Sequence, residues 1–427
     1  MLRVRVTLEI SIPEEGLDAN QIEEIVARET RGLQRQLIVM VFGELERVLL
    51  AERGLGVVKK GKVGKYLCTR CGWIQYERQK VREEGEEGKR YYYPLDEALG
   101  LSPHQEVTEW VRKRGVELAC DHPYRQAAEL LGAEIGEVVS HRTLHRWVQE
   151  EGKKLGAQEE EVRRRVFEGA QTLEREEGPE REIVVVEVDG TMLASQEKRG
   201  EHFEAKLGLM YSGKELESKE AKRRRYRLKE KVLYGGVEDS QAFGEKLYLK
   251  GEQNLQLDRA KNLLFVGDGA RWINEISGRE YWRCASQLDW WHYQRKLREA
   301  LKGQERLIGE LLRLLRAGEG EKHRRLLRLR RMQTREETEQ LDALMEYLER
   351  NWQGLYGSWS LREKVKAQEV LVVGSGAVEK NIELVIGRRF KKRGMSWSRA
   401  GANNLLKLRI HKQDRAAWEA WWDRRAA

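Results

Sequence analysis

The chain has 427 residues, more than one hydrophobic core usually serves, so several domains are expected. Charged residues make up 35% of the chain and hydrophobic residues 40%, with 13 Trp and 14 Tyr, which excludes a disordered chain. The formal net charge of +9 fits a polyanionic partner, and four cysteines exclude a disulfide scaffold. The apolar runs are too short to span a bilayer, so we expect a cytoplasmic protein without a membrane partner.

The N-terminal region, residues 1–60, is expected to hold one strand and one helix. Apolar and polar residues alternate over residues 1–12, which is the period of a half-buried strand. Asn20 with Glu23 is typical of a helix start, and apolar residues then recur at helical spacing from Ile22 to Val48. Four glycines with lysines between them, from Gly54 to Gly64, predict a linker.

A β-hairpin is predicted over residues 61–93, with strands at 66–78 and 90–93. Cys68 and Cys71 precede a Gly-Trp pair, and this pattern is typical of half a zinc ribbon. A structural Zn²⁺ site needs two further ligands, and the nearest candidates, Cys120 and His122, stand at an unusual spacing. Zinc at this hairpin and a pair of ordinary cysteines therefore both stay open.

Residues 94–175 have a helical pattern that includes two helices typical of a helix-turn-helix DNA-binding region. The first covers Tyr124–Leu131 and is expected to end at Gly132; the second begins after Ser140. The apolar side of the second helix consists of Leu144, Trp147 and Val148. The polar side offers candidate DNA contacts at His141, Arg142, Thr143 and Arg146. An ordinary pair of packed helices is the alternative.

The second half of the chain predicts an α+β domain with a mixed sheet and an all-helical insertion. Strands are expected over residues 183–188, 203–211, 231–237, 263–266 and 370–373, and a helix over 377–390. A tract rich in Leu, Arg and Glu separates the last strand from the others. The domain therefore comprises residues 176–292 and 370–427, with the helical insertion at 293–369.

Three carboxylates occupy matching places in this domain. Asp189 and Asp268 each follow an apolar strand and precede a glycine, and Glu379 lies near the start of a helix. Carboxylates on strand ends and a helix can bind Mg²⁺, and two such ions can cut a phosphodiester. Each segment alone is more often an ordinary turn or helix start, so the joint pattern carries the prediction. Glu187 and Glu383 are weaker candidates nearby.

These segments resemble the catalytic core of RNase H-like transposases of the Asp-Asp-Glu class, most closely the Mutator-related and ISLre-type insertion-sequence transposases. In that class the first Asp lies on the first strand, the second follows the fourth strand, and the Glu lies on a later helix. The resemblance implies that Asp189, Asp268 and Glu379 are catalytic and bind two Mg²⁺ ions, for which Mn²⁺ can substitute. Residues 287–292 resemble the group's Cys/Asp-x-x-His signature, which implies that Asp289 and His292 support the active site.

Residues 388–398 resemble the basic Arg-Gly-Met-x-Trp stretch that follows the Glu in ISLre-like members. The DNA contacts implied by this resemblance are Arg388, Arg389, Lys391, Lys392, Arg393 and Trp397. The aromatic residues Trp290, Trp291 and Trp397 are either core residues or a stacking platform for an unpaired base.

The expected function is that of a bacterial insertion-sequence transposase. It would bind the terminal inverted repeats of its element as double-stranded DNA, cleave them with metal ions and transfer the strands to target DNA. Because two ends are paired in this reaction, a homo-oligomer is expected, associated with the nucleoid. The alternatives are an RNase H-like nuclease or resolvase without strand transfer, and a domesticated, non-catalytic DNA-binding regulator.

Overall fold

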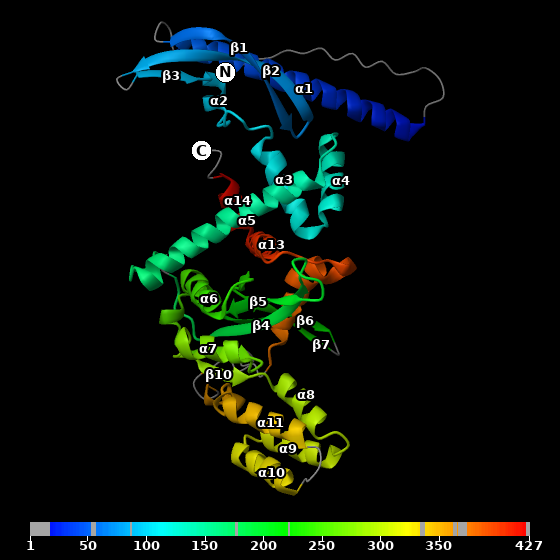
Figure 1. The fold of residues 1–427 in the computed structure, drawn as a ribbon, viewed down its shortest axis with the longest axis vertical. Coiled ribbons are helices and arrows are strands. Elements are labelled where there is room, and N and C mark those ends of the chain that lie inside the picture. Colours follow the sequence, from blue (N-terminus) through cyan, green and yellow to red (C-terminus); the bar gives the residue numbers. More distant parts are fainter. Residues whose placement is uncertain are drawn as a thin grey trace. The chain divides into compact units, whose positions relative to one another are not determined.

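A computed structural model of the chain describes residues 18–52, 57–85, 88–175, 178–220, 223–333, 338–361, 365 and 374–423 (Figure 1). The chain forms two compact units: Met1–Glu150 with His411–Ala427, and Glu151–Ile410. The strands expected at residues 1–12 and 370–373 lie outside the described residues.

In the first unit, a long helix packs on a three-stranded antiparallel sheet. Helix α1 (Ala19–Glu52) begins with a reciprocal cap, in which the backbone NH of Gln21 donates to Asp18 and that of Asp18 donates to Gln21, both at 2.9 Å. The capping residue is therefore Asp18 and not Asn20, and the helix begins at Ala19. The sheet has the order β1 (Val57–Thr69), β2 (Gly72–Gly85), β3 (Gly88–Tyr92). The predicted linker is wrong from Val57 onward, because the last two of its glycines pair within β1.

The helices of the first unit are α2 (Pro94–Ala98), α3 (Glu109–Asp121), α4 (Tyr124–Ile135), the start of α5 (His141–Arg163) and α14 (Arg415–Asp423). Helix α4 continues through Gly132 and ends at Gly136, whose φ of 72° is left-handed. The expected end at Gly132 is therefore wrong: the left-handed residue that ends a helix is four positions later. The oxygen of Ser140 accepts a hydrogen bond of 3.2 Å from the backbone NH of Arg142, as the sequence predicts for α5.

The second unit is built on a five-stranded mixed sheet with the order β10-β9-β4-β5-β8 (Figure 1). Its strands are β4 (Val184–Ala194), β5 (His202–Tyr211), β8 (Val232–Gly236), β9 (Leu263–Gly267) and β10 (Ala285–Leu288). Strand β4 is parallel to β9, β9 is parallel to β10, and β5 is antiparallel to both β4 and β8. The sequence did not predict β10 or the separate hairpin of β6 (Gly213–Glu220) and β7 (Arg223–Lys229).

Strand β4 faces different helices on its two sides. Val184, Val186 and Val188 pack into a core with α6 (Ser240–Leu255) and α7 (Arg271–Arg279). The intervening residues, including Glu187 and Asp189, face α12 (Gly376–Ile382), because side chains alternate along a strand. The pairing of β4 with β9 ends at Glu187, but β4 continues beside β5 to Ala194. Asp189 therefore lies within β4, whereas the sequence predicted that it follows the end of the strand.

The chain between β10 and α12 contains helices α8 (Trp290–Ala300), α9 (Glu305–Arg316), α10 (Gly320–Gln333) and α11 (Thr338–Arg350). These four helices lie side by side (Figure 1) and share a hydrophobic core that also includes Leu288 at the end of β10. A 3₁₀ turn, Trp352–Tyr356, then covers β10, and a β-carbon at Gly357 would overlap the carbonyl oxygen of Ser286. This close approach closes the edge of the sheet next to β10.

Helix α12 continues as a π-helix, Glu383–Lys391, and a 3₁₀ turn, Lys392–Gly394, precedes α13 (Arg399–His411). None of the helices in the described ranges combines the length and the apolar composition that a bilayer crossing requires.

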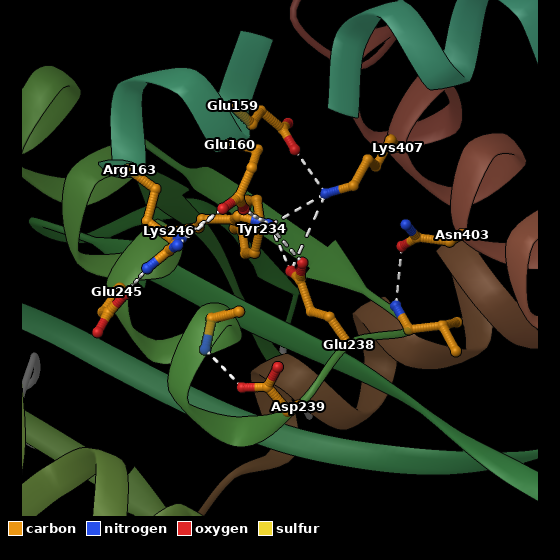
Figure 2. A network of polar contacts seen from close by, with 12 residues as sticks. Glu159, Glu160, Arg163, Tyr234, Glu238, Asp239, Glu245, Lys246, Asn403 and Lys407 are labelled. Carbon is orange, nitrogen blue, oxygen red and sulfur yellow. Dashed lines mark hydrogen bonds and ion pairs between the residues drawn. The ribbon is translucent and has the colours of Figure 1, made fainter. Parts of the chain in front are cut away.

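A buried network of charges fixes α5, α6 and α13 around β8 (Figure 2). The ammonium of Lys407 is 3.0 Å from the hydroxyl of Tyr234 and forms an ion pair with Glu159. Lys246 lies 2.9 Å from Glu160 and 2.7 Å from Glu238. These pairs satisfy charges that would otherwise be costly to bury, so the docking of these helices depends on every partner being present.

Substitution Lys407→Met is expected to lower the free energy of unfolding by about 3–5 kcal/mol, because it leaves Glu159 without its cation and removes one of the two cations beside Glu238. Urea unfolding measures this loss. The control is Lys261→Met, since Lys261 pairs with Glu180 and Glu182 on the surface and its loss should leave the midpoint nearly unchanged. Equal midpoints for both variants would contradict the role given to the network.

Candidate active site

The three predicted carboxylates lie on neighbouring elements of the second unit: Asp189 on β4, Asp268 directly after β9, and Glu379 on α12. The pKa of Asp189 is raised to about 6, chiefly by burial and to a smaller extent by the charges of Asp268 and Glu379, whereas the hydrogen bond from Gly190 and the charge of His292 lower it. Such effects of one charge on another require short separations. The backbone NH of Gly190 donates to Asp189 at 2.7 Å and orients its carboxylate. Residues on a strand, a loop and a helix are thus brought together from distant parts of the chain.

Asp268 lies in a tight loop directly after β9. Its carboxylate accepts a 2.8 Å hydrogen bond from the backbone NH of Ala270, and its carbonyl oxygen accepts one from the hydroxyl of Tyr347 on α11. Gly269 has a φ of 82°, and a β-carbon there would lie 2.8 Å from the side-chain oxygen of Asn351. Glycine is required at this position, and the helical segment directly supports the loop.

Asp289 is fully buried and links the starts of two helices. One carboxylate oxygen caps α8, accepting from the backbone NH groups of Trp291 at 2.6 Å and His292 at 3.2 Å. The other oxygen accepts from the backbone NH of Ser375 at 3.0 Å and from the Ser375 hydroxyl. Burial alone would raise the pKa of Asp289, but the hydrogen bonds from His292 and Ser375 hold it at about 2. Asp289 is therefore an orienting residue with its oxygens already occupied.

His292 connects Asp289 to Glu379. Its Nδ1 atom lies 3.1 Å from a carboxylate oxygen of Asp289 and 3.8 Å from one of Glu379. The hydrogen bond to Asp289 raises the pKa of His292, and the charges of Asp289 and Asp268 add to this effect. The cationic form of His292 therefore balances the negative charge of the site.

The carboxylates of the site are suitable ligands for a hard divalent cation, but their oxygen atoms are not all gathered around one point. In the part of the chain that the structure describes, only Asp289, His292 and Glu379 place ligand atoms from three such residues within 4.8 Å of one another. Asp189 and Asp268 stand outside this group. The side chain of Glu379 is 47% exposed, so tight packing does not hold it in one rotamer.

The basic segment after Glu379 lies partly beside the site. Arg388, Lys391 and Lys392 are exposed, and the ammonium of Lys391 donates to the hydroxyl of Thr191, two residues beyond Asp189 on β4. The predicted DNA contact Arg389 is only 2% exposed, so its side chain is not accessible to DNA in this structure. The side chain of Arg393 lies outside the described residues.

The three tryptophans considered for base stacking have different environments. Trp290 is buried and donates to the carbonyl oxygen of Leu355 at 2.7 Å. Trp397 is also buried, with its ring 4.9 Å from that of Phe390, so its side chain is not accessible to DNA. Trp291 is 68% exposed and lies against Gly374, directly before the helix of Glu379. Of the three, Trp291 alone offers a free ring face.

The start of α5 presents the side chains that the helix-turn-helix pattern predicts. Leu144, Trp147 and Val148 are buried, whereas His141, Arg142 and Arg146 are exposed and Thr143 is half-buried. A β-carbon at Gly115 on α3 would lie 2.7 Å from Leu144, so α3 and α5 pack closely. The turn between α4 and α5 is residues 136–140, shorter than the sequence indicated.

Cys68 and Cys71 lie at the turn between β1 and β2, and both are buried free thiols. Burial raises the pKa of Cys68 to about 11, which disfavours the thiolate that binds zinc. The thiol of Cys71 lies 3.1 Å from the side-chain oxygen of Gln34. Over the described ranges no further Cys, His, Asp or Glu completes a ligand set with them, so the structure gives no support to zinc here.

Ser375 and Tyr347 were not predicted from the sequence, and they hold the helix of Glu379 and the loop of Asp268. Glu187, a weaker candidate from the sequence, holds the helix of Glu379. Ser375 carried a usable signal, since a Ser directly before a helix is a preferred cap. Tyr347 carried none, because its contact joins residues 79 positions apart.

The site thus belongs to a mixed α+β protein, and its acidic residues lie beside the inner strands β4 and β9 of a five-stranded sheet. A family model described as "Uncharacterised protein family (UPF0236)" matches residues 12–425, so the chain belongs to that family.

Two relatives illustrate the range of this similarity. One is a UPF0236 protein of Caldanaerobacter subterraneus subsp. tengcongensis, 26% identical over 92% of this chain and 78% of the relative; its name covers eleven gene loci. Another is a UPF0236 protein in the vanSb 3′ region of Streptococcus gallolyticus, 25% identical over 79% of this chain and 70% of the relative.

Proposed function

We propose that this protein is a transposase that cleaves DNA at the ends of its own mobile element and joins them to a target. One observation carries the proposal: β9, which Asp268 follows, pairs with β4, which carries Asp189, and α12, which carries Glu379, is hydrogen-bonded to β4 through Glu187. The three carboxylates lie on the first strand of the sheet, directly after its fourth strand in chain order, and on a helix beyond a helical segment. These are the places that the resemblance to RNase H-like transposases implies, and the catalytic unit is proposed to have that fold.

The chemistry of the site suits phosphodiester cleavage. Two Mg²⁺ ions held by the three carboxylates would lower the pKa of a bound water and offset charge on the leaving oxygen. The chain's own residues have separate tasks. Asp289 orients His292, and His292 lies beside Glu379. Lys391 presents a cation near Asp189 that could bind a DNA phosphate.

The relatives add an independent argument for mobility. A protein name that covers eleven loci of one genome indicates a gene that has multiplied there. Multiplication within a genome is what a transposase accomplishes for its own gene. The same copying is not expected of an ordinary nuclease or a regulator.

A strand-transfer assay tests the proposal against its nuclease alternative. The substrate is a labelled duplex carrying the DNA that flanks the gene, precut to expose the 3′ hydroxyl at the element end, with a plasmid as target. Labelled plasmid formed in Mg²⁺ but not in EDTA supports a transposase. Release of short fragments without any joined product would favour a nuclease or resolvase.

Recognition of the element end is proposed to involve the start of α5. Arg142→Ala with Arg146→Ala should weaken binding to the end duplex by at least about tenfold and reduce the slope of log affinity against log salt by about 2, if both arginines contact phosphates. Fluorescence anisotropy across a salt series gives both values. The control is Lys153→Ala, an exposed cation further along α5, which should change neither. Unchanged binding by the double variant would remove α5 from the interface.

A further inference from the structure

Glu187 is a fully buried carboxylate next to the candidate site, and both of its oxygens have donors. One oxygen accepts a 2.7 Å hydrogen bond from the hydroxyl of Tyr211 on β5. The other accepts a 2.9 Å hydrogen bond from the backbone NH of Val378, in the first turn of α12. Burial raises the pKa of Glu187, and the hydrogen bonds from Tyr211 and Val378 oppose that rise. Because its oxygens are occupied and shielded from solvent, Glu187 is not placed to bind a metal ion itself.

Helix α12 is therefore held at its start by two buried carboxylates from different elements. Glu187 takes the NH of Val378 from the side of β4, and Asp289 takes the NH of Ser375 from the side of α8. The first NH groups of a helix have no partners within the helix, so these two acceptors fix where the helix begins and how it is turned. Glu379 follows Val378 directly. A shift of this turn would move the carboxylate of Glu379 relative to Asp189.

We propose that Glu187 is a positioning residue, which sets the rotation of α12 so that Glu379 can reach the two aspartates. The expected effect of Glu187 on catalysis rests on the proposed function. The claim that Glu187 holds α12 does not, because it follows from the contacts of Glu187 with β5 and α12.

The first experiment tests the structural part without DNA. Hydrogen exchange is followed over residues 374–382 in the wild type, Glu187→Gln and Glu187→Leu. The amide of Gln keeps an acceptor for the NH of Val378, so its exchange should stay near that of the wild type. In Glu187→Leu, exchange at Val378 should accelerate by at least about tenfold, as expected when a hydrogen bond worth about 1.4 kcal/mol or more is lost. Equal protection in all three proteins would overturn the proposal.

The second experiment tests the catalytic consequence. The Mg²⁺ concentration that gives half-maximal cleavage should rise by at least about tenfold in Glu187→Leu, and stay within about twofold of the wild type in Glu187→Gln. Affinity for the DNA end should not change. The control is Glu252→Leu, which removes a buried carboxylate from α6 on the opposite face of the sheet and should lower stability without altering the Mg²⁺ dependence.

The outcomes separate the two proposals. A folded Glu187→Leu protein with the Mg²⁺ dependence of the wild type would overturn the positioning role, and so would a Gln variant as impaired as the Leu variant. Absence of cleavage by the wild type would instead overturn the proposed function, and the exchange result would still decide whether Glu187 holds α12.

Discussion

Asp189→Asn, Asp268→Asn and Glu379→Gln are each expected to reduce DNA cleavage by at least about 10³-fold, while affinity for the DNA end changes by less than about twofold. Each substitution keeps the size of the side chain and removes one anionic oxygen ligand from a shared metal site, so the loss falls on the transition state. Binding is retained because DNA recognition is assigned to α5 and the exposed cations. Rates on a labelled end duplex and anisotropy on the same duplex measure the two effects.

Glu383→Gln is the matched control for this series. Glu383 lies one turn beyond Glu379 and is exposed, with Lys392 at 3.9 Å. It makes no contact with the carboxylates of the site in the described residues, so its loss should leave cleavage within about threefold of the wild type. A Glu383 variant as inactive as Glu379→Gln would mean that the helix, and not the Glu379 carboxylate, is what matters.

Asp189→Asn is also expected to make the metal-free protein more stable. The folded-state pKa of Asp189 is raised from 3.8 to about 6, chiefly by burial. Its contribution to stability is therefore fully present below pH 3.8 and is lost as the pH rises through about 6. At neutral pH the ionised carboxylate costs about 3 kcal/mol, at about 1.4 kcal/mol for each unit of pKa shift.

Thermal unfolding in EDTA at pH 5 and pH 7.5 tests this expectation. The variant should unfold several degrees above the wild type at pH 7.5, with a smaller difference at pH 5. Mn²⁺ should raise the unfolding temperature of the wild type and not of the variant, because a cation offsets the cost of the ionised carboxylate. The surface carboxylate Asp239, which caps α6, provides the control, and Asp239→Asn should not stabilise the protein. A destabilised Asp189→Asn protein would contradict the raised pKa of Asp189 and the cost of its ionised form.

Residues with strong local patterns were predicted well from the sequence. The apolar runs at residues 203–211, 231–237 and 263–266 form β5, β8 and β9 within one or two residues, because their hydrophobic period matches their environment. The inward residues of α5 were predicted correctly for the same reason. The three carboxylates were also found as candidates from the sequence, because each is near a clear strand or helix, although Asp189 lies within β4.

Features that depend on contacts between distant residues could not be predicted from local sequence patterns. Gly61 and Gly64 suggested a linker, yet pairing with β2 makes them part of a strand. Arg389 and Trp397 suggested a DNA surface, yet they pack together, with the guanidinium 5.1 Å from the ring centre. A basic run indicates charge but not which side chains face solvent, because tertiary packing decides that.

The hydrogen bonds that arrange the site belong to the same class. The contact of Asp289 with Ser375 joins residues 86 positions apart, and that of Glu187 with Val378 joins residues 191 apart. A single sequence points to the carboxylates as candidates, but apart from the cap signal at Ser375 it does not indicate which donors hold them.

The central claim is that Asp189, Asp268 and Glu379 form one metal-dependent cleavage site. The most direct measurement is cleavage of an uncut duplex that spans the junction between the element and its flanking DNA, compared in Mg²⁺ and in EDTA. We expect the wild type to cut at the junction only with Mg²⁺, and Asp268→Asn to bind the duplex without cutting it. Tight binding by the wild type with no cleavage in Mg²⁺ or Mn²⁺ would contradict the claim and leave a DNA-binding regulator as the better account.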